Sequence, residues 1–216
     1  MNRDLTLEKL RENYKFGVLD KSMLDNNPLA QFNLWMQEAI NSKILEPNAM
    51  CLSTVDINLQ PHSRIVLLKG LDHGFVFYTN YNSLKAKQLA VNNKAALNFL
   101  WLDLERQVRI IGEIEKVDEK TAELYFNSRP LDSQLGAIAS PQSEVISDRN
   151  ILTSKLSSLK KIYNANNLPK KPLDWGGFRL LPKSIEFWQG RKSRLHDRLR
   201  FDKQADSTWK IVRLAP

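Results

Sequence analysis

Closely spaced β-strand signals constrain the fold of this chain more than any other feature of its sequence. Short runs rich in β-branched and aromatic residues, separated by turn-like stretches, are typical of strands. Such runs cover residues 49–55, 62–69, 74–78, 95–101, 107–117, 177–181, 184–189, 199–203 and 209–214. They are too closely spaced for repeated right-handed βαβ crossovers, which place a helix between parallel strands. We therefore predict about nine strands that form an antiparallel barrel.

Helical patterns precede and interrupt these runs. Asn27 followed by Pro28 is typical of a helix start, because asparagine caps helices and proline suits their first turn. We expect the apolar stripe of this helix to be buried. The stripe consists of Leu29, Phe32, Trp35, Met36 and Ile40. Further helices are expected over residues 6–14, 84–92, 118–127 and 147–163. The predicted fold class is therefore mainly β with helical insertions (α+β).

Length and composition indicate one domain. A chain of 216 residues can bury one good core, and 42% hydrophobic with 26% charged residues is ordinary for a globular protein. We expect a single domain over residues 1–216, with an N-terminal helical segment over residues 1–45. The net charge of +8 at pH 7 favours anionic partners, but it does not separate nucleic acid from small phosphates or flavins.

Several chemistries and compartments are disfavoured by what the sequence lacks. It contains neither GxGxxG nor GxxxxGK[ST], so side chains must hold any phosphate. The three histidines are far apart without HExxH, and GxSxG is also missing, so no metal site or serine nucleophile is expected. Cys51 is the single cysteine, and no apolar run resembles a signal peptide or a membrane span. We expect a cytoplasmic protein.

The segment between Glu186 and Arg200 combines an aromatic side chain with a dense cationic cluster. Trp188 can stack on a flat ring, and guanidinium groups such as those of Arg194 and Arg198 can pair with phosphate. His196 can exchange a proton near neutral pH. These residue types suit a flat, anionic ligand. The alternative is a solvated basic loop.

Two cations stand within an otherwise apolar strand signal. Arg64 and Lys69 are an odd number of positions apart, which in a strictly alternating strand would place them on opposite faces. Either one of them faces a ligand, or both lie near a strand end. Burying a cation is costly unless an anion accompanies it, so a bound phosphate would explain the pattern. An edge strand that faces solvent is the alternative.

Other polar groups are spaced as in a phosphate site. Tyr78 and Thr79 end a strand signal, and Lys85 lies in the first turn of the next expected helix, where an anion or an ordinary cap would fit. Side chains spaced by four can share a helix face, although Pro130 interrupts the helix here. This set consists of Tyr125, Arg129 and Ser133. Amides and hydroxyls that can read the edge of a heterocycle come from Gln107, Gln142 and Ser143.

Together these segments resemble the pyridoxine/pyridoxamine 5'-phosphate oxidase family from about Arg11 to Pro216. The matching motifs are RIVLLK at 64–69, FYTN at 77–80, ERQV at 105–108, YFNSRPLDSQLGA at 125–137, QS at 142–143, WGGFR at 175–179, IEFWQG at 185–190 and RLHDR at 194–198. The resemblance implies the FMN-binding split barrel, an antiparallel Greek-key barrel that forms a homodimer with FMN at the subunit interface. Residues 175–216 would supply C-terminal strands that bind substrate and FMN.

The resemblance also implies a role for each matching residue. FMN would be bound by Arg64, Ile65, Val66, Leu67, Leu68, Lys69, Tyr78, Thr79, Lys85, Gln107, Gln142, Ser143, Trp188 and Arg198. The substrate would be bound by Arg11, Tyr14, Lys69, Tyr125, Arg129, Ser133, Arg194 and His196, of which the last two would be catalytic. Two positions depart from the family's usual pattern. Leu84 replaces an arginine before Lys85, and Asn13 replaces a glutamate.

The implied activity is FMN-dependent oxidation of pyridoxamine 5'-phosphate and pyridoxine 5'-phosphate by O₂. The products would be pyridoxal 5'-phosphate, hydrogen peroxide and, from the amine, ammonia, in vitamin B6 biosynthesis and salvage. Another split-barrel FMN oxidoreductase, such as a flavin reductase, would share the cofactor residues without the substrate clamp. A basic barrel that stacks RNA bases on its tryptophans is an alternative from a different class.

Overall fold

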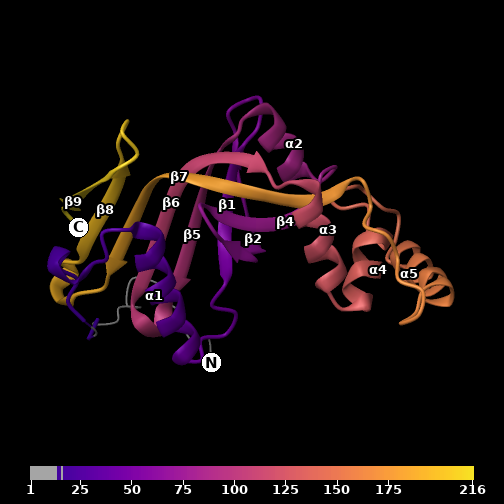
Figure 1. The fold of residues 1–216 in the computed structure, drawn as a ribbon, viewed down its shortest axis with the longest axis horizontal. Coiled ribbons are helices and arrows are strands. Elements are labelled where there is room, and N and C mark those ends of the chain that lie inside the picture. Colours follow the sequence, from indigo (N-terminus) through magenta and orange to yellow (C-terminus); the bar gives the residue numbers. More distant parts are fainter. Residues whose placement is uncertain (1–13, 16) are drawn as a thin grey trace, which may run out of the picture. The chain divides into compact units, whose positions relative to one another are not determined.

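The computed structural model describes Tyr14, Lys15 and residues 17–216 of the chain (Figure 1). Arg11, Asn13 and most of the predicted helix over residues 6–14 therefore lie outside the described residues. The chain forms two compact units. The first unit contains the described residues up to Pro47, Asn98–Ile110 and Ser184–Pro216, and the second unit contains Asn48–Leu97 and Ile111–Lys183.

The strands form one sheet whose neighbours run in the order β2-β1-β5-β6-β7-β4-β3, with β8 pairing to β7 and β9. Their bounds are β1 Ala49–Val55, β2 Pro61–Leu67, β3 Gly70–Leu71, β4 Phe75–Asn80, β5 Lys94–Trp101, β6 Arg106–Lys116, β7 Trp175–Gln189, β8 Asp197–Lys203 and β9 Trp209–Leu214. The pairs β1–β2, β3–β4, β4–β7, β7–β8 and β8–β9 are all antiparallel. The predicted mainly β, antiparallel fold with helical insertions is confirmed.

The strand β7 corrects one prediction, because it replaces the two separate strands expected over residues 177–181 and 184–189. Its first part pairs with β4 through Trp175–Leu180, and its last part pairs with β8 through Ser184–Gln189. Pro182 lies between these two registers, where its missing N–H removes no hydrogen bond from either ladder. Proline therefore marks a change of partner within the strand rather than its end. The two-residue strand β3 was not predicted.

The helix α1 (Pro28–Asn41) begins as the sequence predicts. The Asn27 side chain accepts a hydrogen bond from the Leu29 N–H at 3.0 Å. Phe32 is buried and packs on Phe99, with 4.9 Å between ring centroids. The prediction for Ile40 was wrong, since that side chain is 47% exposed. The buried stripe of α1 ends one residue earlier, at Ala39.

The other α-helices of the described residues belong to the second unit and are α2 (Leu84–Val91), α3 (Glu119–Ser128), α4 (Leu131–Ala139) and α5 (Asn150–Ile162). Short 3-10 helices over Lys21–Met23, Leu102–Leu104 and Lys192–Arg194 belong to the first unit. Asp118 caps α3 by accepting the Thr121 N–H at 2.9 Å. The helix α3 ends at Arg129, whose extended backbone (φ −76°, ψ 150°) is the conformation that a following proline favours. This break lets α3 and α4 present side chains to one pocket. Among the described residues, no helix is long and apolar enough to cross a membrane.

Candidate active site

A pocket of about 940 Å³ lies in the second unit, lined by β2, β4, the start of α2 and the α3–α4 break. This volume is at the upper end of the range for small-molecule and cofactor sites. The predicted site residues that line it are Arg64, Ile65, Val66, Leu67, Lys69, Tyr78, Thr79, Lys85, Tyr125, Arg129, Ser133, Gln142 and Ser143. Leu68 was predicted to bind FMN, but it is only 9% exposed and is not among the lining residues.

The guanidinium of Arg64 is held in the pocket by three hydrogen-bond acceptors that were not predicted from the sequence. Its Nη1 donates to the Leu52 carbonyl at 3.1 Å and to Thr54 Oγ1 at 2.6 Å, and its Nη2 donates to Gln88 Oε1 at 3.2 Å. Thr54 and Gln88 are themselves buried and linked by a hydrogen bond of 2.6 Å. Thr54 is a polar side chain within the apolar run at residues 49–55, and this position could have indicated a buried hydrogen-bonding role. Desolvation lowers the pKa of Arg64.

Lys85 is a second cation in this part of the pocket. It is 8% exposed, and its Nζ donates to Thr79 Oγ1 at 3.2 Å. Burial lowers the pKa of Lys85, and the nearby charge of Arg64 lowers it further. Among the ion pairs between described residues, none includes Arg64 or Lys85. Two cations desolvated side by side without a carboxylate favour a bound anion.

Lys69 shares the pocket with Arg64, although strict alternation would have put them on opposite faces. The strand β2 ends at Leu67, so the period of two no longer applies at Lys69. The Lys69 N–H donates instead to the Val76 carbonyl at 2.8 Å, at the turn into β3. The two cations therefore meet in one pocket near the end of a strand, which is shorter than the predicted run over residues 62–69.

A third cation enters the pocket from the helix break. The Arg129 guanidinium lies 4.9 Å from the ring centroid of Trp175, within range of a cation–π contact. Its Nη1 is buried and has no hydrogen-bond partner among the described residues. Burial lowers the pKa of Arg129. Tyr125 from α3 and Ser133 from α4 line the same pocket, so the three groups spaced by four meet despite Pro130.

Two loop residues complete this pocket. Gln142 Oε1 accepts from Thr79 Oγ1 at 2.9 Å and from the Asn80 N–H at 3.1 Å. Ser143 adopts φ +73°, a conformation that is costly for a residue with a side chain. Leu84 also lines the pocket, so it adds an apolar surface where a basic residue was the usual family choice.

The first unit contains a cluster of three rings. Tyr14 stands edge-on to Trp188 and to His196, with centroid distances of 5.6 and 5.3 Å. Trp188 and His196 are 4.7 Å apart. The backbone at Arg194 has φ +61°, directly after Ser193 at φ +56°, so the connection from β7 to β8 turns tightly around this cluster.

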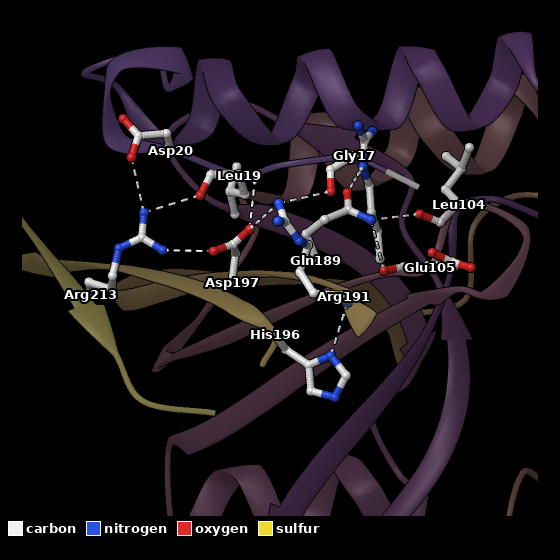
Figure 2. Close-up of polar contacts among 11 residues, drawn as sticks. Gly17, Leu19, Asp20, Leu104, Glu105, Gln189, Arg191, His196, Asp197 and Arg213 are labelled. Atoms are coloured by element: carbon white, nitrogen blue, oxygen red, sulfur yellow. Dashed lines mark hydrogen bonds and ion pairs between the residues drawn. The ribbon is translucent and has the colours of Figure 1, made fainter. Parts of the chain in front are cut away.

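A hydrogen bond to the His196 ring determines which of its nitrogens carries the proton in the neutral form (Figure 2). Its Nδ1 lies 3.1 Å from the backbone nitrogen of Arg191, an N–H donor, so Nδ1 acts as the acceptor. The proton of the neutral ring is therefore on Nε2. Burial lowers the pKa of His196, and the charge of Arg194 lowers it further. Near neutral pH the imidazole thus offers an N–H donor at Nε2.

Arg198, a predicted FMN ligand, is engaged by a carboxylate on the neighbouring strand. Its Nε donates to Glu186 Oε1 at 2.7 Å, and its Nη1 donates to the Ala215 carbonyl at 2.8 Å. The hydrogen bond to Glu186 raises the pKa of Arg198. Gln107, on β6, is half-buried and belongs to the first unit.

Comparisons with known proteins agree with these features. Residues 36–163 match the family described as pyridoxamine 5'-phosphate oxidase, and residues 175–216 match the pyridoxine 5'-phosphate oxidase C-terminal dimerisation region. A Polaromonas sp. JS666 protein named pyridoxine/pyridoxamine 5'-phosphate oxidase is 51% identical, over 100% of this chain and 99% of its own length. A Burkholderia mallei protein of the same name is also 51% identical, over 98% of this chain and 99% of its own length.

Two solved structures are similar in fold. PhzG from Burkholderia lata 383, in complex with tetrahydrophenazine-1-carboxylic acid, has a TM-score of 0.86 at 26% identity and covers 92% of this chain and 98% of its own. A pyridoxamine 5'-phosphate oxidase-related, FMN-binding protein from Nostoc punctiforme has a TM-score of 0.71 at 14% identity, with 89% and 100% covered. These likenesses agree with the predicted split-barrel fold.

Proposed function

The chain belongs to the pyridoxamine 5'-phosphate oxidase family of oxidoreductases, and we propose that it oxidises pyridoxamine 5'-phosphate and pyridoxine 5'-phosphate to pyridoxal 5'-phosphate. FMN would be the cofactor and O₂ the electron acceptor. Hydrogen peroxide would be released, together with ammonia from the amine substrate. The role would be vitamin B6 biosynthesis and salvage in the cytoplasm.

The observation that carries this proposal is the Arg129 guanidinium, which enters a pocket with a buried Nη1 that has no partner among the described residues. A planar, forked donor suits the oxygens of a phosphate monoester better than a lysine does. The Tyr125 and Ser133 hydroxyls and Lys69 in the same pocket would complete a clamp around this phosphate. A flavin reductase would have no use for such a clamp.

The second set of cations fits the phosphate of FMN. Arg64 and Lys85 are desolvated without a carboxylate partner among the described residues, so a phosphate would relieve the cost of burying them. Thr79, Gln142 and Ser143 would add hydroxyl and amide groups. When bound, FMN would accept the electrons of the substrate and pass them to O₂.

The ring cluster of the first unit would position the substrate's heterocycle. The Trp188 face would contact the flavin, while Arg194 and His196 would contact the pyridine ring. Because Nδ1 of His196 accepts the Arg191 N–H, its Nε2–H would donate a hydrogen bond rather than remove a proton. His196 would thus orient the substrate, and Arg194 would stabilise its charge.

We further propose a homodimer with FMN at the subunit interface. The match of residues 175–216 to a dimerisation region supports this assembly. Membership of an oxidase family argues against the alternative of an RNA-binding barrel.

The test compares two substrates that differ only in the phosphate. The holoprotein is supplied with pyridoxamine 5'-phosphate or pyridoxamine, and O₂ consumption and hydrogen peroxide are measured. We expect kcat/KM to fall at least about a hundredfold without the phosphate, since two lost charge-assisted hydrogen bonds cost at least about 3 kcal/mol. Equal kcat/KM values would contradict the clamp. Turnover with a reduced nicotinamide but with neither vitamer would favour a flavin reductase.

A further inference from the structure

Residues 17–20 make polar contacts with Arg191 and Asp197, near the connection between β7 and β8, and with Arg213 on β9 (Figure 2). The Gly17 carbonyl accepts from Arg191 Nη1 at 3.4 Å. The Leu19 carbonyl accepts from Arg213 Nη2 at 3.2 Å. Residues 17–19 therefore lie beside side chains from the C-terminal part of the chain.

Asp197 is at the centre of these contacts, as Figure 2 shows. Its Oδ2 accepts from the Leu19 N–H at 3.1 Å and from Arg191 Nη1 at 3.3 Å. Its Oδ1 accepts from Arg213 Nη1 at 2.8 Å. The Asp197 side chain is 16% exposed, so its bonds to two guanidinium groups are partly shielded from water. We call Asp197 with Leu19, Arg191 and Arg213 the Asp197 hub.

The Asp197 hub is linked to two side chains that are expected to contact the substrate, His196 and Tyr14. Arg191 contacts Asp197 through its side chain, and its backbone N–H donates to His196 Nδ1 at 3.1 Å. On the other side, the hub binds both backbone polar groups of Leu19, five residues after Tyr14. The Tyr14 ring packs so closely on Gly190 that a Cβ there would lie 2.7 Å from two ring atoms. The Tyr14 ring is therefore in close contact with the backbone of Gly190, directly before Arg191.

We propose that Asp197 is a positioning residue, which holds Tyr14 and the Nε2–H form of His196 in place for the substrate through Leu19 and Arg191. Asp197 itself need not touch the substrate or the cofactor. Its effect on substrate binding rests on the proposed function, but its effect on the placement of Tyr14, residues 17–20 and the imidazole does not.

The first experiment measures kinetics of the Asp197→Ala and Asp197→Asn holoproteins with pyridoxamine 5'-phosphate. Asp197→Ala should raise KM about tenfold or more with a much smaller change in kcat, and Asp197→Asn, which keeps one acceptor oxygen, should be intermediate. Asp202→Ala is the matched control, because Asp202 lies on the same strand and pairs with Arg200 at 2.8 Å. The control should behave as the parent protein does.

The second experiment does not depend on turnover. Trypsin cleavage after Lys15 and Lys21 is timed in each holoprotein, and the ¹⁵N signals of the His196 ring are recorded by NMR. Asp197→Ala should be cleaved faster, and its imidazole should lose the Nε2–H pattern or titrate at higher pH. Asp202→Ala should change neither.

Parent-like KM, cleavage and imidazole signals in Asp197→Ala would overturn the proposal. Faster cleavage and altered His196 signals with a raised KM would support it. If the parent protein did not oxidise pyridoxamine 5'-phosphate at all, the proposed function would fail, and cleavage and NMR would still decide whether Asp197 positions these groups.

Discussion

Replacing Arg129 by alanine tests the substrate clamp most sharply. The guanidinium enters the pocket with a buried Nη1 that no described residue satisfies, and Trp175 lies 4.9 Å beneath it. A forked pair of charge-assisted hydrogen bonds to phosphate contributes about 3 to 6 kcal/mol in total. Because Lys69, Tyr125 and Ser133 line the same pocket and would still hold the phosphate, we expect a net loss of about 2 to 4 kcal/mol. This loss corresponds to a rise of roughly 30- to 700-fold in KM for pyridoxamine 5'-phosphate.

The Arg129→Ala substitution should weaken substrate binding without a comparable loss of thermal stability. Burial lowers the pKa of Arg129, which means that desolvating its charge is costly. Removing the charge relieves that cost while losing the contact with Trp175, so the Tm of the unliganded protein should change by less than about 3 °C. A substitution that damaged the fold as a whole would instead lower both Tm and kcat.

The assay is steady-state kinetics with Arg129→Ala, Arg129→Lys and the exposed-site control Arg149→Ala. The lysine variant keeps a charge without the fork, so its KM should lie between those of the parent and alanine proteins. Arg149→Ala should match the parent protein. An unchanged KM in Arg129→Ala, with FMN still bound, would refute the assignment of this pocket region to the substrate phosphate.

Substitutions at three further positions, and the pH dependence of stability, probe other parts of the site. His196→Gln, which can place an amide N–H near the Nε2 position, should keep more turnover than His196→Asn. The lowered pKa of His196 means that the unfolded state binds its proton first, so this group's contribution to stability should decrease as pH falls from about 6.5 towards the folded pKa, as thermal melts against pH would reveal. Leu84→Arg should tighten FMN binding several-fold by adding a cation beside Lys85, measured by flavin titration, and a weaker affinity would argue against a phosphate there. Gly190→Ala should raise KM without loss of FMN, because its Cβ would displace Tyr14.

Local signals predicted much of the fold from sequence. The caps at Asn27 and Asp118 form as expected, because a short polar side chain next to a helix start acts within one turn of chain. Strand bounds were also close, since runs of β-branched and aromatic residues depend on local chemistry. Errors arose where tertiary pairing decides, as at Pro182 within β7 and at Lys69 beyond β2.

In the candidate site too, features that depend on the local sequence could be predicted, whereas features that depend on tertiary packing could not. The types of side chain that would bind phosphate could be identified from motif and charge. The supports behind them could not, because Thr54, Gln88 and Arg64 meet only when β1, β2 and α2 pack together. The tautomer of His196 likewise depends on a backbone N–H five residues away, which no spacing rule identifies.

The most direct test of the account is the visible spectrum of the FMN-loaded protein under anaerobic conditions, with pyridoxamine 5'-phosphate added and then air. The account predicts that the substrate bleaches the flavin band, and that O₂ restores it as pyridoxal 5'-phosphate accumulates. A flavin band that stays unchanged on addition of either phosphorylated vitamer would contradict the proposed reaction.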